Sequence, residues 1–240
     1  EKPDLSNIRA VRILVESEDP PFAFIGAEGL PTGFAVELGR AICLELEVPC
    51  TVQTLRWALL PSGIESGLGD AIIGSFAVTA ESRARFDFSS TFLTRPARFL
   101  VRRDSPELEM IPEGLAGKRV GVQAGTAHEA YLRAFFPGSV LHVYPNAEDA
   151  HAAIKNGDIE ALFEDGLNAS LWLNGKTSEN CCRFAGGPFT EARYFGEGLT
   201  VAVEPGNERL REAFDFALAR IQQNGTYSEI FLRYFPVSFY

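Results

Sequence analysis

The sequence predicts an α/β protein built from two units, and two observations support this prediction. Segments typical of strands and segments typical of helices alternate along most of the 240 residues, with short connections between them. The alternation then restarts after residues 94–103, as expected where one unit ends and another begins. Each unit is therefore expected to be a sheet covered by helices on both faces.

The first unit is expected to begin with strands and helices that lead to a polar turn. Leu38, Ile42 and Leu46 recur at a helical spacing, and Pro49 then ends that helix. In chain order, the expected elements are a strand at 11–17, a helix at 33–48, a strand at 50–55, a helix at 56–67 and a strand at 70–76. The turn that follows carries hydroxyl groups and a guanidinium, which are groups that bind anions at the end of a strand.

The second unit repeats this pattern. In chain order, we expect a strand at 118–125, a helix at 125–136, a strand at 140–145, a helix at 146–157, a strand at 159–165 and a helix at 166–175. Asn146 is a suitable N-cap for the second of these helices, because its side chain can accept a hydrogen bond from the first turn.

The last part of the chain, residues 195–235, contains one strand and two helices, which are too few for a domain. Its apolar residues need a surface to pack on, and the first unit can offer one. We therefore expect a discontinuous first lobe, residues 1–95 and 196–240, and a second lobe, residues 96–195, with a cleft between them.

Composition and charge exclude several classes of protein. The chain is 46% hydrophobic and has a formal net charge of -10, so it can bury a sizeable core and would repel nucleic acid and anionic membrane surfaces. Apolar runs are shorter than the roughly 20 residues of a membrane helix, and the first ten residues lack the features of a signal peptide. If the chain is exported, its signal has already been removed.

The four cysteines form two pairs in the sequence. Cys43 and Cys50 flank a helix end and could form a disulfide there, although Cys43 could equally be a small buried hydrophobic residue. Cys181 and Cys182 are adjacent, and neighbouring residues rarely satisfy disulfide geometry. We therefore expect Cys181 and Cys182 to be free thiols.

Five separated blocks of the sequence resemble the family 3 extracellular solute-binding proteins, the polar amino-acid receptors of bacterial ABC transporters. The resemblance extends from Val11 to Phe235, and its blocks match in spacing as well as in residue type. They are residues 33–46 (GFAVELGRAICLEL), 59–92, 115–132 (LAGKRVGVQAGTAHEAYL), 157–165 (GDIEALFED) and 194–235.

The resemblance implies a two-lobed, type II periplasmic-binding-protein-like fold with a ligand cleft between the lobes. It also implies a monomeric periplasmic protein that binds a small amine-bearing solute and delivers it to the permease subunits of an ABC transporter. Basic amino-acid receptors of the family carry a disulfide where this chain has Cys43 and Cys50. The resemblance therefore favours that bond and an oxidising compartment.

The polar turn departs from the family pattern, which reads T-x-E-R. There the arginine binds the ligand's α-carboxylate through paired hydrogen bonds. Here the turn reads Thr79, Ala80, Glu81 and Ser82, and Arg83 lies one position further on. One residue on a helical turn is about 100° of rotation, so we expect Arg83 to be a solvated surface charge.

Other positions that contact the ligand in the family have also changed. Asp19 replaces an aromatic residue, Arg56 replaces the usual aromatic wall with Trp57 beside it, and one serine of the strand-end loop is Ala77. Asp165 is retained, and in the family this carboxylate binds the ligand's α-ammonium group. The expected ligand-binding residues are Glu16, Asp19, Phe22, Arg56, Trp57, Ser75, Phe76, Ala77, Ser82, Thr126 and Asp165.

Three interpretations of these changes stay open. In the one that we favour, Arg56 supplies a guanidinium from a new direction and the ligand is still a zwitterion. In the second, Glu16, Asp19 and Asp165 make the cleft acidic and the ligand is a cationic amine without a carboxylate. In the third, Arg56 only neutralises these carboxylates, because unpaired buried charges are costly.

Other chemistry has weaker support. The histidines, His128, His142 and His151, lack metal-ligand spacing and are expected at exposed positions, so we predict no metal and no cofactor. Cyclohexadienyl dehydratases share this fold but place a carboxylic acid three residues after the equivalent of Asp165, where this chain has Asn168. We therefore expect a receptor and not an enzyme; the sensing domain of a receptor histidine kinase is a further alternative.

Overall fold

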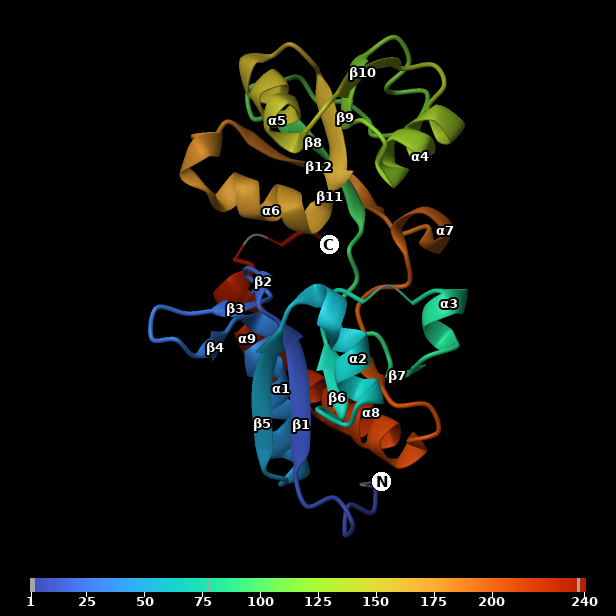
Figure 1. The fold of residues 1–240 in the computed structure, drawn as a ribbon. Helices are drawn as coiled ribbons and strands as arrows, with labels where there is room; N and C mark the ends of the chain where they lie inside the picture. Colours follow the sequence, from blue (N-terminus) through green and yellow to red (C-terminus); the bar gives the residue numbers. More distant parts are fainter. Residues whose placement is uncertain (1–2, 77, 237) are drawn as a thin grey trace. The chain divides into compact units, whose positions relative to one another are not determined.

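The computed structural model describes residues 3–76, 78–236 and 238–240 (Figure 1). It divides the chain into two compact units. The first unit consists of Glu1–Thr94 and Glu197–Tyr234, and the second consists of Arg95–Gly196 and Phe235–Tyr240.

The end of the chain differs from the expectation that residues 196–240 belong to the first lobe. The segment Phe235–Tyr240 is part of the second unit. Phe235 and Phe239 are fully buried, and their rings meet edge to face with centroids 6.1 Å apart. Phe239 also packs on Gly166: a Cβ atom added at Gly166 would lie 3.3 Å from the Cβ atom of Phe239. This apolar packing explains why the segment Phe235–Tyr240 belongs to the second unit.

The first unit is built on a mixed five-stranded sheet in the order β5-β1-β6-β13-β7. β1 is parallel to both β5 and β6, whereas β13 is antiparallel to β6 and to β7. The strands are β1 (Val11–Glu16), β5 (Cys50–Leu55), β6 (Ala71–Ile73), β7 (Asp87–Phe88) and β13 (Val201–Val203). A small antiparallel sheet contains β2 (Glu18–Asp19), β3 (Ala23–Ile25) and β4 (Pro31–Thr32).

Helices cover both faces of this sheet, as Figure 1 shows for α1 and α2. Alternate residues of a strand point to opposite faces. Ile13 accordingly packs on α1 at Gly39, whereas Leu14 clusters with Leu60 and Ile64 of α2. The helices are α1 (Phe34–Leu46), α2 (Leu60–Glu65), α3 (Ala80–Arg83), α8 (Glu208–Gln223) and α9 (Thr226–Tyr234), and a 3₁₀ turn (Trp57–Leu59) precedes α2.

The second unit is built on a five-stranded sheet in the order β10-β9-β11-β8-β12. β9 is parallel to β10 and β11, and β8 is antiparallel to β11 and β12. The strands are β8 (Ala97–Arg102), β9 (Arg119–Gln123), β10 (Val140–Tyr144), β11 (Ala161–Asp165) and β12 (Cys182–Phe189).

Two apolar clusters occupy the two faces of this second sheet. Phe99 and Phe163 belong to a cluster with residues of α4, whereas Leu100 and Leu162 belong to one with residues of α5 and α6. The helices are α4 (Ala127–Phe135), α5 (Ala147–Asn156), α6 (Gly166–Asn174) and α7 (Ala192–Phe195), with a 3₁₀ turn at Lys176–Ser178. Asn146 caps α5, as the sequence predicts, because its Oδ1 accepts a hydrogen bond from Asp149 N at 2.8 Å.

Candidate functional site

The expected site residues of the first unit gather where its parallel strands end. β1 ends at Glu16, β5 ends just before Arg56 and Trp57, and β6 ends just before Ser75 and Phe76. Because parallel strands have their carboxyl ends at one edge of the sheet, these residues lie at the same edge. In open α/β sheets this is the edge at which ligands bind.

The polar part of this edge is acidic. Ser75 Oγ donates a hydrogen bond to Asp19 Oδ2 at 3.0 Å. Partial burial raises the pKa of Glu16, and the negative charges of Asp19 and Glu18 raise it further. A cation placed beside Glu16 and Asp19 would relieve this repulsion.

The apolar part of the same edge is a pocket of about 370 Å³. The rings of Trp57 and Phe76 form one side of it, with centroids 4.8 Å apart. The pocket is lined by Trp57, Phe76, Thr79, Glu81, Ser82, Arg85 and Phe86. It can receive an apolar group between an aromatic wall and the polar turn.

Ser82, which replaces the family's arginine, has a local structural role. It forms a reciprocal capping box with Thr79 at the start of α3: Ser82 N donates to Thr79 Oγ1 at 3.1 Å, and Thr79 N donates to Ser82 Oγ at 2.8 Å. Its neighbour Arg83 is exposed and pairs with Glu197 at 2.8 Å, as expected of a surface charge. The turn thus presents no guanidinium at the position of Ser82.

The other expected residues of the first unit have different environments. Phe22 is a core residue that is 4% exposed and packs edge to face on Phe34. Arg56 is exposed and forms no ion pair within the described part of the chain. The interpretation that Arg56 neutralises Glu16 and Asp19 therefore has no contact to support it. Ala77 lies outside the described residues.

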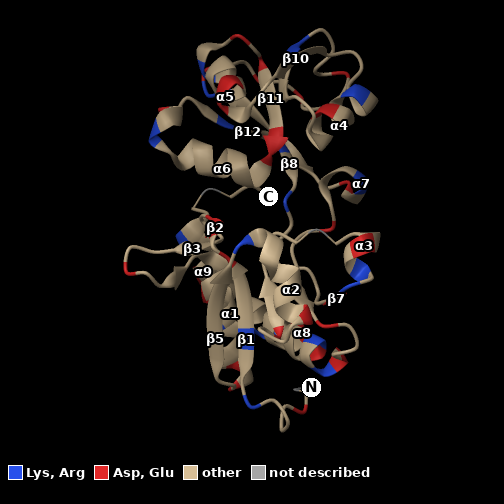
Figure 2. Ribbon diagram, viewed as in Figure 1, with Lys and Arg blue, Asp and Glu red and all other residues tan. Residues whose placement is uncertain are grey.

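Asp165 and Thr126 lie at the carboxyl edge of the second sheet, and each caps a helix. Thr126 Oγ1 accepts a hydrogen bond from Glu129 N at 3.2 Å at the start of α4. Asp165 Oδ1 accepts one from Asn168 N at 2.9 Å at the start of α6. Figure 2 shows the acidic end of β11, where Asp165 is the last residue.

The sequence interpretation missed the partner of Asp165, which is Arg95. Arg95 Nε donates to Asp165 Oδ2 and Arg95 Nη2 donates to Oδ1, both at 3.1 Å. Nη2 also lies 3.3 Å from Asn168 Oδ1. The side chains of Arg95 and Asp165 are 27% and 17% exposed, so the pair is partly shielded from water.

The prediction that the histidines are exposed is wrong, because each of the three is at least partly buried. His128 stacks on Phe195 with ring centroids 5.2 Å apart, and burial lowers its pKa although the charge of Asp165 opposes this effect. His151 lies under Trp172, with ring centroids 4.2 Å apart, and its Nε2 is 2.7 Å from Glu164 Oε1. Burial raises the pKa of Glu164 in spite of this hydrogen bond.

The two cysteine pairs have different outcomes. The disulfide between Cys43 and Cys50 is confirmed, with Cα atoms 6.0 Å apart. The prediction that Cys181 and Cys182 are free thiols is wrong, because they form a disulfide with each other. Glu179 and Asn180 precede them in left-handed conformations, with φ values of 50° and 55°, so the pair follows a tight turn that sequence spacing does not reveal.

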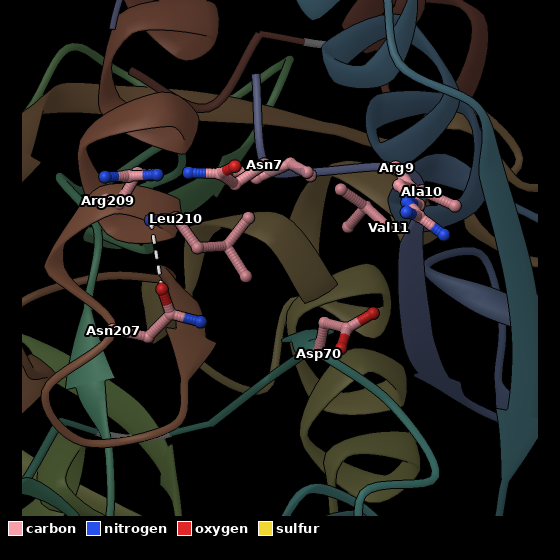
Figure 3. A pocket seen from close by; sticks show the side chains of 9 residues that line it. Asn7, Arg9, Ala10, Val11, Asp70, Asn207, Arg209 and Leu210 are labelled. Carbon is pink, nitrogen blue, oxygen red and sulfur yellow. Dashed lines mark hydrogen bonds between the residues drawn. The ribbon is translucent and has the colours of Figure 1, made fainter. Parts of the chain in front are cut away.

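A second cavity of the first unit lies at the amino end of its sheet (Figure 3). It has a volume of about 420 Å³ and is lined by Asn7, Ile8, Arg9, Ala10, Val11, Asp70, Asn207, Arg209 and Leu210. Asn207 caps α8 there by accepting a hydrogen bond from Leu210 N at 3.3 Å. Asp70 is paired with Arg12 at 2.7 Å. This cavity lies at the edge of the sheet opposite the carboxyl ends of its parallel strands, where ligands bind in open α/β sheets, so the carboxyl edges remain the stronger candidate sites.

Two features are absent from residues 3–76, 78–236 and 238–240. These residues contain no group of three or more His, Cys, Asp or Glu side chains arranged to hold a metal ion. Within the same ranges, no helix combines the length and the apolar character that crossing a membrane requires.

The two α/β units, with polar side chains at the carboxyl edges of their sheets, define the class of two-lobed periplasmic binding proteins. The sequence model of a protein family, the bacterial extracellular solute-binding proteins, family 3, matches residues 11–237. The chain belongs to that family. A relative, ABC transporter arginine-binding protein 1 of Escherichia coli (strain K12), is 31% identical over 222 residues. That match covers 92% of this chain and 89% of the relative.

Solved structures agree with this assignment of the fold. The unliganded, open L-cystine solute receptor of Neisseria gonorrhoeae matches with a TM-score of 0.81 and 19% identity, over 96% of this chain and 95% of that one. An ancestral cyclohexadienyl dehydratase matches with a TM-score of 0.78 and 18% identity, over 97% of this chain and 95% of that one. At such identities both matches show the fold alone.

Proposed function

We propose that this chain is the extracytoplasmic, periplasmic receptor of an ABC transporter and binds an amino acid or an amine-bearing amino-acid derivative. Family membership and the arginine-binding relative support this function. The receptor would act as a monomer and deliver its ligand to the permease subunits. Each unit offers polar side chains at the carboxyl edge of its sheet as candidate ligand contacts.

Asp165 is the observation that carries the proposal. Its carboxylate ends β11, is 17% exposed, and is held against the guanidinium of Arg95. A carboxylate in so shielded a place needs a cationic partner, because an unpaired charge is costly there. The same environment suits the ammonium group of a ligand.

The first unit supports a ligand with a positive charge as well. The pKa of Glu16 is raised first by its partial burial and then by the negative charges of Asp19 and Glu18. Trp57 and Phe76 add an apolar wall for the rest of the ligand. A cation with an apolar portion matches both features, and this description includes most amino acids and their amine derivatives.

A binding role fits the second unit better than dehydratase chemistry. A dehydratase of this fold needs a carboxylic acid to protonate a leaving hydroxyl group. The residue at that position is Asn168, whose amide oxygen accepts a hydrogen bond from Arg95 Nη2. An amide in this arrangement has no acidic proton to give.

The test is a thermal-shift screen of amino acids, opines, betaines and polyamines, followed by calorimetry. A ligand at 100 times its Kd stabilises the native state by about 2.7 kcal/mol. We expect a primary amine to raise the melting temperature, and Asp165→Asn to weaken its binding by about 2–5 kcal/mol. Asp158→Asn, at an exposed carboxylate of the same unit, is the control. Stabilisation only by solutes without a nitrogen cation would refute the proposal.

A further inference from the structure

Arg95 and Asp165 each have hydrogen-bonding capacity that the contacts among the described residues do not use. A carboxylate has about four lone-pair sites. Asp165 uses three of them, for Arg95 Nε, Arg95 Nη2 and Asn168 N. One acceptor site, on Oδ2, is left for a further donor.

Arg95 likewise has N–H donors without an acceptor among the described residues. A guanidinium has five N–H groups. Nε and Nη2 bind Asp165, and the second N–H of Nη2 makes the longer contact of 3.3 Å with Asn168. Nη1 has no hydrogen-bond partner among the residues that the structure describes. If a ligand oxygen replaced Asn168 Oδ1 in this long contact, one N–H of Nη1 and one N–H of Nη2 would be available side by side. This pair of parallel donors is the fork with which arginine binds a carboxylate bidentately.

The turn of the first unit offers no such fork. Ser82 is engaged in its capping box, and Arg83 is exposed and paired with Glu197. Among the guanidinium groups considered for the ligand's carboxylate, Arg95 is the one that is partly buried and already held in a fixed orientation.

We propose that Arg95 binds the carboxylate of the ligand while Asp165 binds its ammonium group, so that one ion pair recognises both charges of an α-amino acid. This inference rests on the proposed function and assigns a carboxylate anchor to it. The ammonium and carboxylate groups of an α-amino acid are bonded to the same carbon atom, so two opposite ligand charges lie close together and match two protein charges that are in contact. Arg95 stays bonded to Asp165 throughout, which keeps its fork oriented before the ligand arrives.

An opposite role for Arg95 makes the opposite prediction. If the guanidinium only occupies Asp165 in place of the ligand's ammonium group, the ligand must displace it. Removal of Arg95 would then tighten binding. The free acceptor site on Asp165 argues against this role, because an ammonium group can bind there without displacement.

The experiment compares each amino acid with its carboxamide, in which the carboxylate alone is neutralised. The probes are L-arginine, L-lysine, L-histidine and L-glutamine and their carboxamides, measured by calorimetry on the wild type, Arg95→Ala and Arg95→Lys. In the wild type we expect the acid to bind about 100-fold more tightly than the carboxamide. Arg95→Ala should abolish this preference by lowering the affinity for the amino acid. Arg95→Lys should reduce the preference about tenfold, because lysine lacks the bidentate fork.

Arg133→Ala is the matched control, because Arg133 is also paired with a carboxylate in this unit but is 59% exposed. It should leave both affinities unchanged. An undiminished preference for the acid in Arg95→Ala or in Arg95→Lys would overturn the inference and leave the proposed function standing, as would tighter binding of the acid by Arg95→Ala. If Arg95→Ala fails to fold, Arg95→Lys decides the question. Failure of every probe to bind the wild type would overturn this inference, whereas the wider screen tests the proposed function separately.

Discussion

Breaking the disulfide between Cys43 and Cys50 should destabilise the first unit by a predictable amount. The bridge joins α1 to the start of β5 over a sequence separation of 7. For a loop of this size, the chain-entropy model gives a contribution of about 2.5 kcal/mol. If all 240 residues unfold as one cooperative unit with an unfolding entropy of about 2.1 cal/mol/K per residue, this corresponds to a fall of about 5 °C in the melting temperature.

Cys50→Ala is the suitable perturbation, because Cys50 is half-buried whereas Cys43 is 3% exposed. The variant removes the cross-link and leaves the buried sulfur of Cys43 in place. Urea unfolding at equilibrium, followed by circular dichroism, measures the loss of stability. Thiol titration under denaturing, non-reducing conditions should find no thiol in the wild type and one in the variant.

Cys181→Ala is the control, because that disulfide closes a sequence separation of only 1 and the variant leaves in place the sulfur of Cys182, which is 1% exposed. So small a loop restricts the unfolded chain little, and we expect a loss below about 1 kcal/mol. Equal losses in the two variants, or a loss below about 0.5 kcal/mol in Cys50→Ala, would contradict the chain-entropy reasoning.

Three further predictions concern charge, capping and the polar turn. Burial raises the pKa of Glu164 in the folded protein above its ordinary value of 4.5. This group therefore favours folding fully below that ordinary value and loses the contribution as the pH rises through the folded pKa. Glu164→Gln should therefore gain stability relative to the wild type as the pH rises from 4 to 8 in urea titrations, and a constant difference would contradict this. Ser82→Ala should cost about 1 kcal/mol, measured in the same way, because the Thr79 N–H loses its acceptor, whereas a neutral result would mean that water replaces the cap. Ser82→Arg should not raise the affinity for the ligand found in the screen, and a tenfold gain in calorimetry would show that the usual carboxylate site still works here.

The alternation of apolar patterns predicted most strands of the two five-stranded sheets but missed β7, β8 and β12. Each expected strand and helix has a counterpart, although two boundaries moved for local reasons. The expected helix at 56–67 is split into a 3₁₀ turn and α2, which has Pro61 in its first turn. The strand expected at 70–76 is limited to Ala71–Ile73, since the chain bends at the carboxyl edge.

The site was predicted less completely, because its contacts depend on strand register. Arg95 is 70 positions away from Asp165 in the sequence. The antiparallel pairing of β8 with β11 places Ala97 opposite Asp165, and this register brings the preceding Arg95 within reach. Sequence reasoning treated the same segment as a linker. Likewise, spacing alone could not reveal that His151 meets Glu164, which lies on a different element.

The chain passes from one unit to the other at three peptide bonds, Thr94–Arg95, Gly196–Glu197 and Tyr234–Phe235. As a result, Asp4 belongs to the first unit and Tyr240, which is 50% exposed, belongs to the second. Two fluorescent dyes attached at cysteines introduced at these positions would report directly on the separation of the units. The native cysteines of the described chain are all disulfide-bonded, so no native thiol there would compete for the dyes.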